Sequence, residues 1–127
     1  MNSQKASYSC VILDDEPIII KIIERYISNI ENLELKASFT SPLDAMAAFK
    51  SYEKIDFLFL DIEMEVSGFD IARMLRNSVK FIVFISSHST YSIGDLVNGD
   101  KLLVKPVDFR AFHDHVNQLI SKDNEKS

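Results

Sequence analysis

The sequence is poor in cysteine, in long apolar runs and in positive charge, and each shortage excludes a class of protein. Cys10 is the only cysteine, so an internal disulfide is impossible and a reduced, cytoplasmic setting is expected. No apolar run approaches the roughly 18–20 residues of a membrane span, and the polar start MNSQKASYS does not predict a signal peptide. Since the formal net charge is -5, we expect no direct nucleic-acid binding and no membrane association.

The length fits one domain. The chain has 127 residues, and domains commonly contain about 100–150 residues. A hydrophobic content of 46% is ordinary for a soluble globular protein. We expect residues 1–7 to be disordered, residues 8–121 to form the domain, and residues 122–127 to be a disordered tail or the start of a linker.

Apolar runs of strand length recur along the chain. They are Tyr8–Leu13, Leu33–Phe39, Ile55–Leu60, Lys80–Ile85 and Leu102–Val104. The central runs lack a clean alternation of apolar and polar residues, which is typical of strands covered on both faces. The chain therefore predicts five strands, most of them buried.

Segments with helical periodicity lie between and after these runs. The predicted helices are Pro17–Asn29, a second after the capping residue Ser41, a third after Ser67, a frayed fourth within 89–101 and a fifth after Asp108. Gly94 and Gly99 weaken the fourth helix. For the second helix, the expected core face is Leu43, Met46, Ala47 and either Phe49 or Tyr52.

Strands that alternate with helices over short connections predict an α/β fold, an open parallel sheet with helices on both faces. In such sheets ligands bind beyond the carboxyl ends of the strands. The predicted strands end there in a set of polar groups: Asp14 and Asp15, Asp61, Ser86, and Lys105 followed by Pro106. Carboxylate oxygens suit Mg²⁺, and a carboxylate can attack phosphorus when nearby positive charge offsets the phosphoryl group.

Four motifs, LDDE, FLFLDIEM, FISS and LLVKP, stand in order at these strand ends. In this order they resemble the receiver domain of bacterial two-component response regulators. The resemblance implies a CheY-like, flavodoxin-like (βα)5 three-layer sandwich with a five-stranded parallel sheet in the order 2-1-3-4-5. It also implies a phosphoacceptor in a phosphorelay, with Mg²⁺ as cofactor and no enzymatic reaction beyond self-phosphorylation and autodephosphorylation.

The resemblance assigns a role to each acid. Asp61 is then the phosphoacceptor, which takes a phosphoryl group from a sensor histidine kinase or a phosphotransfer protein. Asp15 binds Mg²⁺ directly, together with Asp61 and the backbone carbonyl of Glu63. Asp14 acts on the metal largely through water.

The same resemblance assigns the phosphoryl contacts and the switch. Lys105 pairs with the phosphoryl oxygens, and Ser86 is the switch hydroxyl. The peptide bond between Lys105 and Pro106 is expected to be cis. A downstream protein or effector domain would recognise the switched surface.

Several positions depart from the family pattern. After Asp61, the loop has Glu65 where the family usually has proline, and Gly68 comes one residue early. Leu102 replaces the usual switch aromatic, and Tyr91 is a candidate to substitute for it. These departures change residues of the output surface more than they change the catalytic acids.

Two further positions in the family tune the lifetime of the phosphoryl group. They correspond to Glu63 and His88, each two residues past a site residue. We therefore expect an unusual lifetime of the phosphorylated form, in a direction that the sequence does not give.

Other functions remain open at this stage. One alternative is a pseudo-receiver that binds partners without phosphorylation; another is the receiver part of a LytTR-type transcription regulator, since DIEM is similar to receivers of that type. A haloacid dehalogenase-type phosphatase is disfavoured, because DIEME lacks the second aspartate of its motif. Homodimerisation through the fourth and fifth helices is common in the family, so the resemblance also allows a homodimer.

Overall fold

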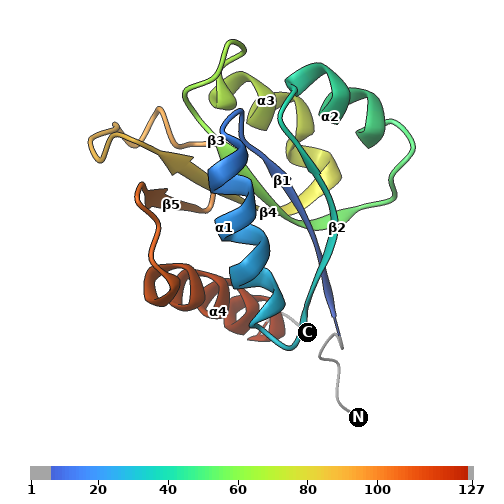
Figure 1. Cartoon of the computed structure of the whole chain (residues 1–127), viewed down its shortest axis with the longest axis vertical. Helices are drawn as coiled ribbons and strands as arrows, with labels where there is room; N and C mark the ends of the chain where they lie inside the picture. Colours follow the sequence, from blue (N-terminus) through green and yellow to red (C-terminus); the bar gives the residue numbers. More distant parts are fainter. Residues whose placement is uncertain (1–6, 126–127) are drawn as a thin grey trace.

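A parallel sheet lies between two layers of helices in the computed structural model, which describes residues 7–125 (Figure 1). The elements are β1 (Tyr8–Leu13), α1 (Pro17–Ser28), β2 (Leu33–Phe39), α2 (Pro42–Phe49), β3 (Ile55–Asp61), α3 (Gly68–Leu75), the 3-10 turn η1 (Arg76–Ser78), β4 (Val79–Ser86), β5 (Lys101–Val104) and α4 (Phe109–Glu125). Within these residues the five strands are parallel in the order β2-β1-β3-β4-β5. The predicted fold class and strand order are confirmed.

Helices cover both faces of the sheet. Helices α1 and α4 pack on one face, where Ile23 and Phe112 are fully buried, and α2 and α3 pack on the other, where Ala45 and Ile71 are fully buried (Figure 1). All seven residues of β3 are buried. This explains why the central strands are apolar without alternation: both faces of each strand point into a core.

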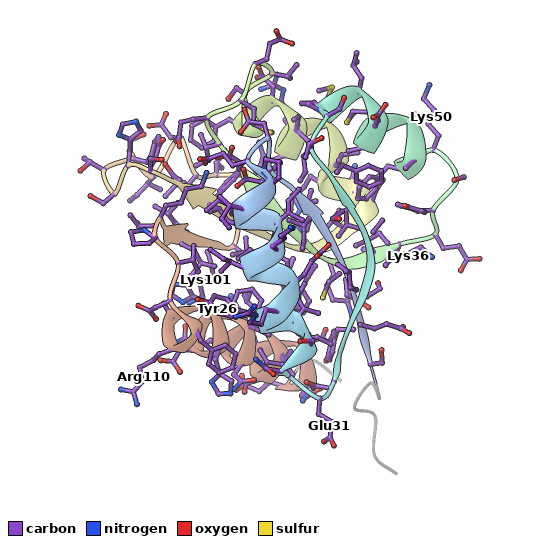
Figure 2. All side chains as sticks on the ribbon, in the orientation of Figure 1. Tyr26, Glu31, Lys36, Lys50, Lys101 and Arg110 are labelled. Carbon is purple, nitrogen blue, oxygen red and sulfur yellow. The ribbon has the colours of Figure 1, made fainter. Side chains whose placement is uncertain are left out.

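The two helices on the first face are joined by an aromatic contact. The ring of Tyr26 on α1 packs against the rings of Phe109 and Phe112 on α4, and its hydroxyl donates a hydrogen bond to the backbone carbonyl of Val107, 2.8 Å away. Figure 2 shows Tyr26 at the place where α1 meets α4. This contact secures the chain just after β5, close to the carboxyl edge of the sheet.

The last helix is longer than expected. Asp108 caps it as predicted, since its Oδ1 accepts a hydrogen bond from the Ala111 amide at 2.8 Å. The helix continues through Glu125, so residues 122–125, which we expected in the tail, are helical. Residues 1–6 and 126–127, also expected to be disordered, lie outside the described residues.

The frayed fourth helix of the prediction does not form. None of the described residues between β4 and β5 belongs to an α-helix, so the arrangement has four α-helices within residues 7–125 and is not a complete (βα)5. The side chains of Ser92 and Asp95 each accept a hydrogen bond from the other residue's amide, and successive turns follow up to Gly99. So short a segment with two glycines gains too little from helical hydrogen bonds to continue.

The predicted core face of α2 is wrong in part. Leu43 is 78% exposed and Ala47 is also exposed, whereas Ala45 and Phe49 are buried and Met46 packs at the edge of the core. Most of this helix is apolar, so the spacing of its apolar residues gives little direction. As a separate finding, no helix within residues 7–125 has both the length and the apolar character to cross a bilayer.

Candidate functional site

Polar side chains from four strands meet at the carboxyl edge of the sheet. Asp14 follows β1, Asp61 ends β3, Ser86 ends β4 and Lys105 follows β5. Lys105 Nζ lies 3.3 Å from Asp14 Oδ2 and 3.5 Å from Asp61 Oδ1. Both carboxylates and Ser86 are buried. The structure thus brings together the residues that the sequence placed at one edge.

Asp61 is buried without full pairing. It is 1% exposed, and among the described residues its Oδ2 has no hydrogen-bond partner. Burial and the neighbouring carboxylate of Asp14 raise the pKa of Asp61 to about 7, against the opposing charge of Lys105; Asp15 adds to the increase. Perturbation of this kind by burial and like charge is typical of functional carboxyls.

Asp14 is also incompletely paired. Its Oδ1 accepts a hydrogen bond from the Glu16 amide at 2.8 Å, while its Oδ2 forms the ion pair with Lys105 outside hydrogen-bond geometry. Burial raises the pKa of Asp14, against the opposing effects of the Glu16 amide and Lys105. One lysine therefore serves two buried acids.

A third acid contacts the same lysine. Glu16 Oε1 lies 2.5 Å from Lys105 Nζ. Burial lowers the pKa of Lys105, but the hydrogen bond that it donates to Glu16 and the charges of Asp14 and Asp61 raise it overall. The sequence interpretation did not assign Glu16; its only signal was the third acid of LDDE. The bond between Lys105 and Pro106 is cis, as predicted.

The acids at this edge fit a Mg²⁺ site. One oxygen each from Asp14, Asp15 and Glu16 lie within 4.8 Å of one another. The Oδ2 atoms of Asp14 and Asp61 are buried and accept no hydrogen bond from residues 7–125, so they are available to a cation. An all-oxygen donor set with several carboxylates suits Mg²⁺. The predicted ligand role of the Glu63 backbone carbonyl stays a prediction.

Gly68 explains the short loop after Asp61. A Cβ at this position would lie 2.3 Å from the Asp61 carbonyl oxygen and 2.7 Å from Ile62 Cα. The Gly68 amide donates a hydrogen bond to the Ile62 carbonyl at 2.9 Å. Because only glycine permits this approach, α3 begins directly against the end of β3.

The Glu63 carboxylate forms a second polar group beside the acids. Its Oε2 accepts hydrogen bonds from Ser86 Oγ, at 2.5 Å, and from the Tyr91 hydroxyl. Its Oε1 accepts the Ser87 amide at 2.9 Å. Burial raises the pKa of Glu63, but these three hydrogen bonds lower it overall. The structure therefore places Tyr91 against the predicted switch hydroxyl.

The remaining predicted residues lie around this group. The His88 amide donates to Ser86 Oγ at 2.9 Å, and its side chain is exposed. Leu102, at the usual place of the switch aromatic, is half-buried at the edge of the core that also receives Tyr91. Sequence reasoning named Glu63 and Tyr91 separately and missed that they bind each other.

The chain is similar to known proteins along most of its length. Residues 10–117 match the family described as the response regulator receiver domain. Stress response regulator protein 1 of Scheffersomyces stipitis is 38% identical over 82 residues, which are 63% of this chain and 28% of that protein. This chain thus matches only a minor part of the relative's length.

Solved structures of similar fold include a response regulatory domain and a response regulator protein. The response regulatory domain of MrkE from Klebsiella pneumoniae has a TM-score of 0.80 at 21% identity, covering 94% of this chain and 99% of that one. TrrA from Thermotoga maritima, crystallised in complex with Mg²⁺-BeF, has a TM-score of 0.75 at 25% identity, covering 88% of this chain and 98% of that one.

Proposed function

Because this chain belongs to the family of response regulator receiver domains, we propose that it accepts a phosphoryl group on Asp61 and thereby changes its contacts with another protein. The observation that carries the proposal is the state of the Asp61 side chain. It is buried, it has an unpartnered oxygen within the described chain, and it lies 3.5 Å from a lysine. Such an arrangement costs stability and is retained at functional sites.

In the proposed reaction, a carboxylate oxygen of Asp61 attacks the phosphorus of a phosphohistidine on a sensor kinase or phosphotransfer protein. The new O–P bond forms as the P–N bond breaks, and the electron pair passes to the imidazole nitrogen, which takes up a proton. Lys105 neutralises the phosphoryl oxygens, and Ser86 donates a hydrogen bond to one of them. The same acyl phosphate is later hydrolysed by water.

The proposed metal ligands are Asp15, Asp61 and the backbone carbonyl of Glu63, and Asp14 acts on the metal largely through water. Bound Mg²⁺ supplies positive charge that offsets the crowded carboxylates and the incoming phosphoryl oxygens. The similarity to TrrA, crystallised in complex with Mg²⁺-BeF, supports this choice of ion. Glu16 keeps Lys105 near the acids before the phosphoryl group arrives, since it makes the shortest contact with Nζ.

The receiver domain was expected at residues 8–121, and we propose that it extends to residue 125, because α4 continues to Glu125. Its proposed partners are a sensor histidine kinase or phosphotransfer protein upstream and a protein or effector domain downstream. The lone, buried Cys10 suits a reduced cytoplasmic setting. Attachment to a LytTR-type domain and homodimerisation stay predictions.

Phosphorylation by a small donor tests the proposal. The purified protein is incubated with Mg²⁺ and acetyl phosphate, and its intact mass is recorded. We expect a gain of one phosphoryl group that requires Mg²⁺ and falls at least ~100-fold in Asp61→Asn. Asp56→Asn, on the same strand, is the matched control and should retain the gain. A wild-type protein that binds Mg²⁺ but gains no mass would favour the pseudo-receiver alternative.

A further inference from the structure

The hydrogen bonds of the Glu63 side chain to Ser86 and Tyr91 point to a role that the resemblance to the family does not assign. We propose that the Glu63 side chain is a latch, which holds Ser86 and Tyr91 in the unphosphorylated protein and releases them when a phosphoryl group on Asp61 takes the Ser86 hydroxyl. The inference rests on the proposed function, because the phosphoryl group is what opens the latch. It makes Glu63 a positioning residue, acting through Ser86.

The number of protons makes the two states exclusive. Ser86 has a single hydroxyl proton, and it is donated to Glu63 Oε2. Ser86 ends β4, and its neighbour Ile85 pairs with Asp61 in the sheet, so Ser86 lies beside the proposed acceptor. A phosphoryl oxygen on Asp61 and the Glu63 carboxylate therefore compete for the same proton.

Charge acts in the same direction. Glu63 lies two residues beyond Asp61, and its amide donates a hydrogen bond to Asp61 Oδ1 at 3.3 Å. A phosphoryl group adds roughly 1.5–2 negative charges at neutral pH, and this charge repels the Glu63 carboxylate. Phosphorylation thus removes the hydrogen bond from Ser86 and pushes its acceptor away, and both changes loosen the Tyr91 hydroxyl.

Tyr91 links the latch to the surface. Its ring packs edge-on against Phe69, with centroids 5.3 Å apart, and its hydroxyl binds Glu63. The turn that follows it exposes Ile93 and Val97, which are 92% and 72% exposed. This turn makes few buried contacts, so it is free to move when Tyr91 is released. The positions of these two apolar side chains on the surface then change.

This arrangement offers a route from Asp61 to the surface without an aromatic residue at position 102. In the unphosphorylated protein Leu102 already packs against the core. Its side chain has no hydroxyl that could form or lose a hydrogen bond when Ser86 moves. Tyr91 supplies that hydroxyl from the β4–β5 connection. The latch accounts for the presence of a carboxylate at position 63 and a tyrosine at position 91 in the same chain.

The test is a double-mutant cycle on the binding of beryllofluoride with Mg²⁺. Affinity is measured by NMR titration, with the amides of Ser87 and His88 as probes, for wild type, Glu63→Ala, Ser86→Ala and the double variant. We expect Glu63→Ala to bind about tenfold tighter, because the competitor for the Ser86 proton is gone. In the Ser86→Ala background, removing Glu63 should change the affinity less than about threefold, since only its charge remains to be lost.

Two controls separate the latch from charge and from misfolding. Glu65→Ala removes an exposed carboxylate from the same loop and should change the affinity less than about twofold. Dispersed amide spectra and cooperative melting must show that each variant is folded. As a signature specific to the latch, the Tyr91 ring resonances, assigned with Tyr91→Phe, should be displaced in Glu63→Ala before any beryllofluoride is added.

The outcomes are distinct. Equal effects of Glu63→Ala with and without Ser86, or unchanged Tyr91 resonances, would overturn the latch and leave the proposed function intact. Failure of wild type and all variants to bind beryllofluoride would overturn the proposed function and the latch with it. If Glu63→Ala binds beryllofluoride and wild type does not, the latch is supported, because the mimic then cannot displace Glu63 from Ser86 in wild type.

Discussion

Strand β3 has an aspartate near each end, and the two carboxylates are buried in different ways. Asp56 is 6% exposed and its Oδ2 accepts hydrogen bonds from the Ser9 amide at 2.9 Å and the Ser9 hydroxyl at 3.2 Å. Asp61 is 1% exposed, and within the described chain its Oδ2 accepts none. The two carboxylates are therefore alike in burial and differ in the hydrogen bonds that their Oδ2 atoms accept, which agrees with a structural role for Asp56 and with the role proposed for Asp61.

The two edges of the sheet repeat this difference. At the amino edge, Lys80 pairs with Asp123 at 3.2 Å, and the Tyr8 hydroxyl donates to the same carboxylate at 3.0 Å. At the carboxyl edge, Lys105 is shared among three acids, two of them fully buried. At the amino edge the Asp123 carboxylate has these two partners, whereas at the carboxyl edge three carboxylates share one lysine. A bound cation would offset the negative charge that remains there.

Removal of the shared lysine should have the largest effect on stability. Lys105→Met leaves two buried acids without a nearby cation, so we expect the free energy of unfolding without Mg²⁺ to fall by about 3 kcal/mol. Lys80→Met, which breaks a more exposed pair at the other edge, should cost less than about 1 kcal/mol. Urea unfolding of both variants at pH 8 measures the difference. Equal losses in the free energy of unfolding would show that the acids at the carboxyl edge depend on their lysine no more than the acid at the amino edge does.

Magnesium should stabilise the wild-type protein through the carboxyl edge. At about 100 times its dissociation constant, a ligand that binds only the folded state adds about 2.7 kcal/mol to the free energy of unfolding. Melting curves with and without Mg²⁺ should show this gain in wild type and in Asp56→Asn, but only a small part of it in Asp15→Asn. A full gain in Asp15→Asn would contradict the assigned ligands.

The raised pKa of Asp61 predicts a pH dependence. The folded protein holds this proton up to a pKa of about 7, while the unfolded chain releases it near pH 4. Between these values the folded state binds more protons, so stability falls as pH rises. Without Mg²⁺ we expect a loss of about 1–2 kcal/mol from pH 5.5 to 7.5.

The isosteric variant Asp61→Asn isolates that effect. It has no proton to lose, so its unfolding curves over the same pH range should lack most of the decline seen in wild type. If the stability of both proteins declines equally with pH, another titrating group is responsible, and the raised pKa does not belong to Asp61.

The smallest effect is expected at the paired aspartate. Asp56→Asn keeps an acceptor for Ser9 but loses the charge that strengthens both hydrogen bonds, which should cost about 1 kcal/mol. Denaturant unfolding at neutral pH should give the same loss with and without Mg²⁺. If the loss of stability depends on Mg²⁺, Asp56 acts together with the acids of the carboxyl edge, which its position at the amino edge does not predict.

Much of the fold followed from the sequence, because buried parallel strands appear as apolar runs. The bounds of β1 and β2 were predicted to the residue, and the Asp108 and Ser41 caps formed as expected. The face of α2 was wrong in part because its residues are nearly all apolar. The fourth helix was expected to be frayed, but it is absent, because a short segment that contains two glycines gains too little from helical hydrogen bonds to continue.

The residues of the site were predicted better than the contacts between them. Strand ends brought Asp14, Asp61 and Lys105 to one edge, since parallel strands share that edge. The Glu16–Lys105 contact and the hydrogen bonds of Glu63 with Tyr91 were not predicted. Both depend on where two loops lie relative to each other, and no periodicity in the sequence encodes that distance.

Borohydride trapping is the most direct test of which aspartate reacts. Protein treated with Mg²⁺ and acetyl phosphate is reduced with borohydride, which converts an aspartyl phosphate to homoserine, and the altered residue is located by peptide mass spectrometry. The account predicts homoserine at Asp61 and an unmodified Asp56. Homoserine at Asp56 or Asp14, or no homoserine in a protein that has gained a phosphoryl group, would contradict it.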